Sequence, residues 1–76
     1  MYEEIHQIAI EVCGNNSKMT FNELADRLGQ DHRMMGLRVG RAWCYFKDRN
    51  DCGACSVISA AFVDANGKSA ISNKWN

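Results

Sequence analysis

The chain has 76 residues, with nine Lys or Arg, nine Asp or Glu and a formal net charge of zero. This length suits one small domain, so we expect residues 1–76 to form a single domain. It excludes an enzyme that needs separate cofactor and substrate domains. Apolar residues make up 46% of the chain and charged residues 24%, which is typical of a globular protein and not of a disordered one.

Nothing in the sequence points to a membrane. No apolar run approaches the roughly 20 residues that span a bilayer. The segment Met1-Tyr2-Glu3-Glu4 is acidic, whereas a signal peptide begins with basic residues. We therefore expect a cytoplasmic protein with no membrane partner, whose four cysteines stay free in a reducing compartment.

The first predicted element is a helix over residues 2–13. Its apolar residues recur at the spacing of one helix face, and the run 14–17 (Gly-Asn-Asn-Ser) supplies turn-forming residues that end it. The residues of that face are Ile5, Ile8, Ala9, Val12 and Cys13.

Two further helices are predicted with their ends. Thr20 and Glu23 have the spacing of a capping box, so a short helix begins after Thr20, and Gly29 marks its C-terminal stop. Asp31 is placed to cap a third helix that runs from His32 to about Lys47. The apolar stripe of this third helix consists of Met35, Val39, Ala42, Trp43 and Phe46.

Gly36 and Gly40 stand four residues apart inside the third predicted helix. A glycine within a helix costs up to about 1 kcal/mol relative to alanine. We therefore expect a close approach of another part of the chain at these two positions.

The segment 51–67 has two interpretations. As a strand, Ser56–Val63 would turn at Asn66-Gly67 and return over Ser69–Trp75, which would make the chain a winged helix with a C-terminal β-hairpin. As a helix, it would end with Asn66-Gly67 as the C-cap. The high alanine content and weak alternation favour the helix. The predicted fold is thus an all-α domain of about four helices.

The helix, Gly-containing turn and helix of residues 20–47 resemble the helix-turn-helix of DNA-binding proteins, in which the second helix enters the major groove. The resemblance implies duplex DNA as the partner. His32 and Arg33, at the start of the third helix, would lie near base edges, while Lys47 and Arg49 would meet phosphates. The predicted DNA-binding residues are His32, Arg33, Arg38, Arg41, Tyr45, Lys47 and Arg49.

Charge is segregated along the chain. Residues 32–49 contain five basic residues and one acidic residue, a net +4, whereas residues 1–16 contain three acidic residues and no Lys or Arg, a net −3. We expect the five basic side chains to project together from one helix toward one partner.

A second resemblance is to the DNA-binding segment of alkyltransferase-type DNA repair proteins. It is carried by Thr20-Phe21, Glu23-Leu24-Ala25 and Leu28-Gly29, followed by Arg38-Val39-Gly40-Arg41-Ala42. Those proteins place a reactive cysteine in a downstream Pro-Cys-His-Arg run, where this chain has Ala54-Cys55-Ser56-Val57 and lacks the histidine that would help activate the thiol. The resemblance therefore implies DNA contact without repair chemistry. The chain also looks like small phage-encoded proteins of helix-turn-helix character.

The sequence favours neither a metal site nor catalysis. Cys52 and Cys55 form a CxxC pair, but their partners in a zinc site would be the single residues Cys13 and Cys44 and not a second pair. The histidines lie in no recognisable arrangement with an acid and a nucleophile. We therefore expect no catalytic residues, no metal and no cofactor.

An alternative function is a helical protein-interaction module, such as an inhibitor or adaptor, that binds no nucleic acid. Its acidic first helix and basic third helix would pair with another chain, or with a second copy in a homodimer.

Overall fold

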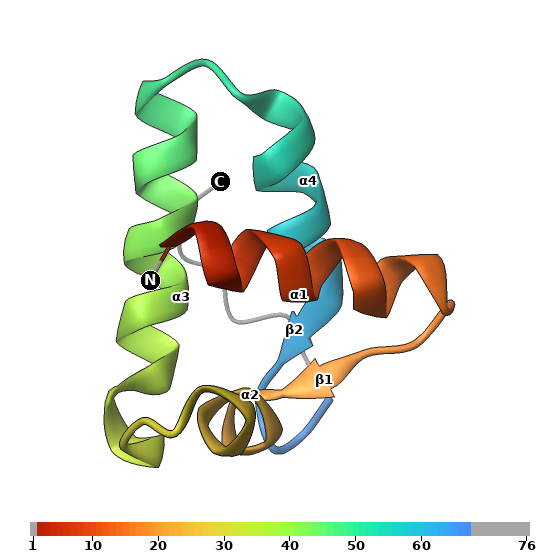
Figure 1. Ribbon diagram of the computed structural model, residues 1–76, viewed down its shortest axis with the longest axis vertical. Coiled ribbons are helices and arrows are strands. Elements are labelled where there is room, and N and C mark those ends of the chain that lie inside the picture. The colour runs from red at the N-terminus through yellow and green to blue at the C-terminus, as the bar shows by residue number, and fades with distance from the viewer. Residues whose placement is uncertain (1, 68–76) are drawn as a thin grey trace.

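The computed structural model describes residues 2–67 of the chain. Within them the chain forms helices and one pair of very short strands, which confirms the predicted all-α class (Figure 1). The elements are α1 (Tyr2–Gly14), β1 (Met19–Thr20), α2 (Phe21–Leu28), α3 (His32–Asp48), α4 (Cys52–Ala61) and β2 (Phe62–Val63).

α1 packs against both α3 and α4 (Figure 1). It buries the apolar face expected from the sequence, with Ile5 and Ala9 fully inaccessible to solvent. After Gly14 the chain leaves the helix through Asn16, whose φ of 53° is left-handed, and the amide of Ser17 donates to the carbonyl of Val12 at 3.1 Å. α1 therefore ends at Gly14, and the chain continues into β1.

α2 has the predicted capping box. The Oγ1 of Thr20 accepts from the amide of Glu23 at 3.2 Å, and the Thr20 amide donates to a Glu23 carboxylate oxygen at 3.2 Å. At the other end Gly29 adopts a φ of 66°, the left-handed conformation in which glycine carries no steric penalty. Both predicted boundaries are confirmed.

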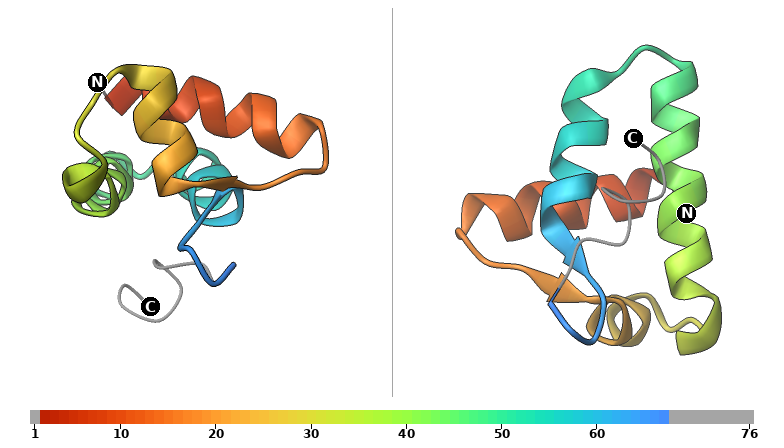
Figure 2. Two further views of the ribbon diagram at one scale, coloured as in Figure 1. Left: turned by 90° about the horizontal axis from the view of Figure 1, so that it is seen from below. Right: turned by 180° about the vertical axis from the view of Figure 1, so that it is seen from behind.

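α3 follows after a turn of residues 29–31, so α2 and α3 form a helix-turn-helix-like unit. Asp31 caps α3 by accepting from the amide of Arg33 at 2.9 Å. α2 lies across the N-terminal end of α3 (Figures 1 and 2). The long C-terminal part of α3 runs on beside α1 and α4.

The close approach predicted in α3 does not occur at Gly36. A Cβ at Gly36 would lie 3.7 Å from the nearest atoms of the Phe21 ring, an ordinary contact distance. An alanine at this position would make ordinary van der Waals contact with the ring, so the packing of α2 on α3 does not require the glycine. Gly40 is buried.

The helical interpretation of segment 51–67 is confirmed as far as Ala61, and the strand over Ser56–Val63 is wrong for most of its length. The predicted C-cap at Asn66-Gly67 is also wrong, because the chain becomes extended at Phe62 (φ −110°, ψ 137°). β2 there pairs in parallel with β1, with Met19 opposite Phe62. The returning strand Ser69–Trp75 lies outside the described residues.

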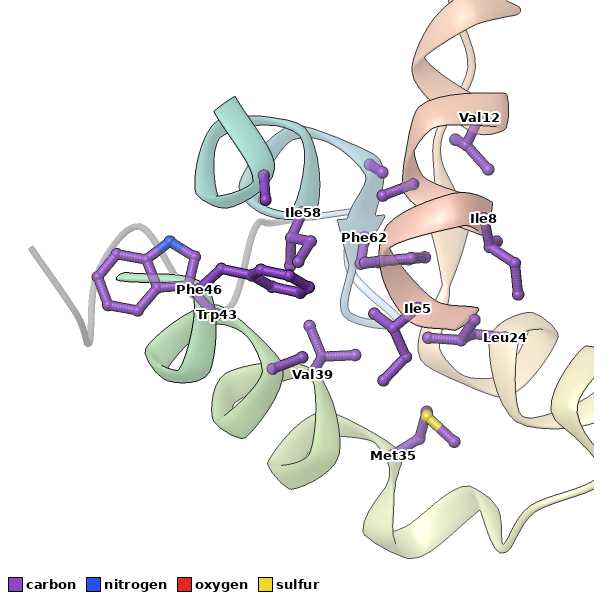
Figure 3. Packing of buried hydrophobic residues seen from close by; sticks show 14 of the residues in the cluster. Ile5, Ile8, Val12, Leu24, Met35, Val39, Trp43, Phe46, Ile58 and Phe62 are labelled. Carbon is purple, nitrogen blue, oxygen red and sulfur yellow. The ribbon is translucent and has the colours of Figure 1, made fainter. Parts of the chain in front are cut away.

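The core joins all four helices and β2 (Figure 3). Among the residues that the structure describes, none that is polar or charged is buried. The largest fully buried side chains are those of Phe62, Ile5, Leu24, Met35, Ile58 and Val39. These apolar contacts fix the side of α3 that faces inward, and so determine which of its polar residues face solvent.

Candidate nucleic-acid interface

The outer flank of α3 brings together part of the predicted site. Arg38, Arg41 and Tyr45 follow one another at spacings of three and four residues, which places them along one side of a helix. Met34 and Leu37 lie beside them and are 43% and 48% exposed. We call Met34, Leu37, Arg38, Arg41 and Tyr45 the α3 flank.

Arg38 is the most enclosed cation of the α3 flank. Its side chain is half-buried, and its Nε is buried without a hydrogen-bond partner among the described residues. Arg38 and Arg41 line a hollow of about 230 Å³, together with Tyr2 of α1, Met34 and Leu37. The hollow therefore combines two guanidinium groups with an apolar and aromatic wall.

Arg49 extends the α3 flank beyond the end of the helix. Its guanidinium lies 4.5 Å from the centroid of the Tyr45 ring, in a cation–π contact. The Tyr45 ring in turn packs on that of Tyr2, with centroids 5.1 Å apart. Arg49 is thus held beside the flank by an aromatic surface to which α1 contributes.

The first turn of α3 is arranged differently. His32 Nε2 lies 2.6 Å from a carboxylate oxygen of Asp26 in α2. The Arg33 guanidinium donates to Asp31 at 3.1 and 3.3 Å. The two residues that the resemblance placed near base edges therefore both contact carboxylates of the chain itself.

Lys47 lies on the other side of α3. It comes nine positions after Arg38, which is two and a half helical turns, and its Nζ lies 5.0 Å from the centroid of the buried Trp43 ring. The expectation that all five basic side chains project together is therefore wrong. Arg38, Arg41 and Arg49 gather on one side, while Arg33 binds Asp31 and Lys47 packs on Trp43.

The ion pairs within residues 2–67 leave the α3 flank untouched. They join Arg27 to Glu11, His32 to Asp26 and Arg33 to Asp31. None of these pairs involves an arginine of the flank. Of the carboxylates in these pairs, that of Asp31 has a lowered pKa, chiefly because the Arg33 side chain and amide donate hydrogen bonds to it.

Two of the cysteine thiols, those of Cys13 and Cys55, donate to backbone carbonyls. The thiol of Cys13 donates to the carbonyl of Val57 at 3.6 Å, and that of Cys55 donates to the carbonyl of Trp43 at 3.4 Å. Burial raises the pKa of Cys55, and the neighbouring Cys52 raises it further. Within residues 2–67 no group of three or more His, Cys, Asp or Glu side chains could hold a metal ion.

Two residues of this surface, Leu37 and Tyr2, are not predicted from the sequence. Leu37 is two residues from buried Met35, and that spacing alone puts it on the opposite side of the helix. The spacing could therefore have predicted its exposure. Tyr2 reaches the α3 flank only because α1 packs beside α3, and no local signal in the sequence contains that information.

Comparison of the chain with protein-family models, with curated proteins and with solved structures finds no match in any of the three. In the part of the chain that the structure describes, no helix has the length and apolar character needed to cross a membrane.

Proposed function

We propose that the chain binds duplex DNA through the α3 flank. The observation that carries the proposal is the gathering of Arg38, Arg41 and Arg49 on one side of the second helix of a helix-turn-helix-like unit, outside every ion pair within residues 2–67. Guanidinium groups donate to phosphate oxygens and to guanine O6 and N7. The role we propose is regulatory, as the resemblance of residues 20–47 to the helix-turn-helix of DNA-binding proteins implies.

Lys47 is left out of this surface because it packs on Trp43 on the other side of α3. Arg33 and His32 line a separate hollow with Phe21 and Gly36. DNA phosphates would compete with Asp31 and Asp26 for these two side chains, so we assign them a smaller share of the affinity. The proposal therefore rests on the three arginines of the flank and its end.

The test is fluorescence anisotropy of a labelled duplex at increasing salt concentration. We expect binding at low salt that weakens steeply as salt rises, since each phosphate contact releases bound cations from the DNA. Replacing Arg38 and Arg41 together by alanine should abolish binding while the circular dichroism of the helices is unchanged. Absence of binding by the unmodified chain at low salt would contradict the proposal.

A second candidate is a protein-interaction module, which is favoured by one specific observation. The large exposed apolar side chains within residues 2–67 are Ile10, Met34 and Leu37, and two of them lie beside Arg38 and Arg41. Met, Tyr and Arg are enriched in protein interfaces. A chain that fails to bind DNA but associates with a second copy in sedimentation equilibrium, and loses this association on Leu37→Ser, would support this candidate instead.

A further inference from the structure

The hollow between α1 and α3 is lined by both cationic and apolar side chains. Its wall includes two guanidinium groups, from Arg38 and Arg41, and one of these belongs to a half-buried side chain. The Nε–H of Arg38 is a buried donor without an acceptor among the described residues. A buried donor in this condition is unfavourable, and most such groups in proteins find a partner.

The donors select the chemistry of the partner. Two guanidinium groups select an anion, because a phosphodiester and a carboxylate each present two charged oxygens that can accept from both groups at once. Tyr2, Met34 and Leu37 complete the wall with apolar and aromatic surface, which suits the carbon atoms of a sugar next to the phosphate. The combination matches a phosphodiester with its deoxyribose better than it matches a free carboxylate.

We propose that the hollow is a binding site for one backbone phosphate of DNA, with Arg38 and Arg41 as its ligands. This inference rests on the proposed function only in naming DNA as the source of the phosphate. The site itself is the hollow lined by Arg38 and Arg41. Arg38 lies in the middle part of α3, not in its first turn, and its side chain is half-buried. A phosphate held there would therefore lie alongside α3. Such a contact sets the position of the helix on the duplex without reading its sequence.

The site can be tested without DNA. Inorganic phosphate is titrated into the chain at constant ionic strength, and the Nε–Hε resonances of the arginines are followed by NMR, with chloride as the control anion. We expect a saturable shift of the Arg38 resonance in phosphate alone, and a weaker response in Arg41→Gln. An Arg38 resonance that responds equally to both anions would overturn the inference.

The second test measures the salt dependence of duplex affinity in Arg38→Gln and in Lys47→Gln. Each variant removes one positive charge, but Lys47 lies on the opposite side of α3 over Trp43. We expect Arg38→Gln to reduce the slope of log affinity against log salt by about 0.9, the value for one lost phosphate contact, and Lys47→Gln to leave it nearly unchanged.

The two proposals fail in different ways. If the unmodified chain binds DNA and Arg38→Gln changes the slope no more than Lys47→Gln does, the phosphate site is wrong and DNA binding stands. If the unmodified chain does not bind DNA, the proposed function is wrong, and the phosphate titration alone then decides whether the hollow is an anion site.

Discussion

Gly36 of α3 faces the ring of Phe21 in α2, and a Cβ at Gly36 would stand 3.7 Å from the ring atoms Cδ2 and Cε2. The contact between the two helices of the helix-turn-helix-like unit therefore has room for one methyl group. Gly36 increases the conformational entropy of the unfolded chain. The folded protein gains no closer contact between α2 and α3 from it.

We expect Gly36→Ala to stabilise the protein by about 0.5–1 kcal/mol, because alanine lowers the conformational entropy of the unfolded chain and fits the helix. The free energy of unfolding in urea measures this directly. The matched variant is Gly29→Ala, which places a side chain at a φ of 66° and should destabilise the protein by about 1 kcal/mol. A destabilising Gly36→Ala would show that α2 and α3 approach more closely than the distance to Phe21 indicates.

The capping box of α2 gives a second prediction. Thr20→Ala removes the hydroxyl that accepts from the Glu23 amide and should reduce the free energy of unfolding by about 1 kcal/mol. Glu23→Gln keeps an oxygen that can accept from the Thr20 amide, so its effect should be smaller. Equal losses in both variants would contradict the assignment of the cap to the Thr20 hydroxyl.

The lowered pKa of Asp31 makes stability depend on pH. The folded protein favours the ionised carboxylate, so the stabilisation is fully present above the ordinary pKa near 3.8 and is lost as the pH falls through the lower folded value. Asp31→Asn keeps a capping oxygen but removes the charge. Urea unfolding should therefore show this variant less stable than the unmodified chain at pH 7, with the difference shrinking below about pH 4.

Asp48→Asn is the control for this measurement. Asp48 is the last residue of α3, where a negative charge is not favoured by the helix dipole, and its removal should cause no loss of stability at pH 7. If the loss in Asp31→Asn persisted unchanged at pH 2.5, the carboxylate charge would not be its cause.

Thiol reactivity separates the cysteines of α4. Cys52 is exposed, whereas the Cys55 thiol is half-buried, donates to the Trp43 carbonyl and has a raised pKa, which reduces its thiolate fraction at pH 8. Alkylation with iodoacetamide, followed by peptide mass spectrometry, should therefore modify Cys52 well before Cys55. Denaturation in urea should remove the difference, and equal rates in the folded protein would contradict the buried placement of Cys55.

The amino-acid sequence alone determined both ends of α2 and the start of α3. Each end is specified within a few residues: Thr20 and Glu23 close a cap across three positions, Asp31 reaches the amide of Arg33, and Gly29 supplies the left-handed residue. These interactions form between neighbours in the chain, so they follow from the local pattern. The inward face of α3 followed from its apolar spacing for the same reason.

The tertiary structure decided the end of α4 and the composition of the candidate site. α4 stops at Ala61 because Phe62 pairs with Met19, 43 positions earlier in the chain, and is buried in the core. Tyr2 joins Arg38 and Arg41 only through the packing of α1 beside α3. These relationships depend on contacts between distant segments, which a local pattern of residues does not contain.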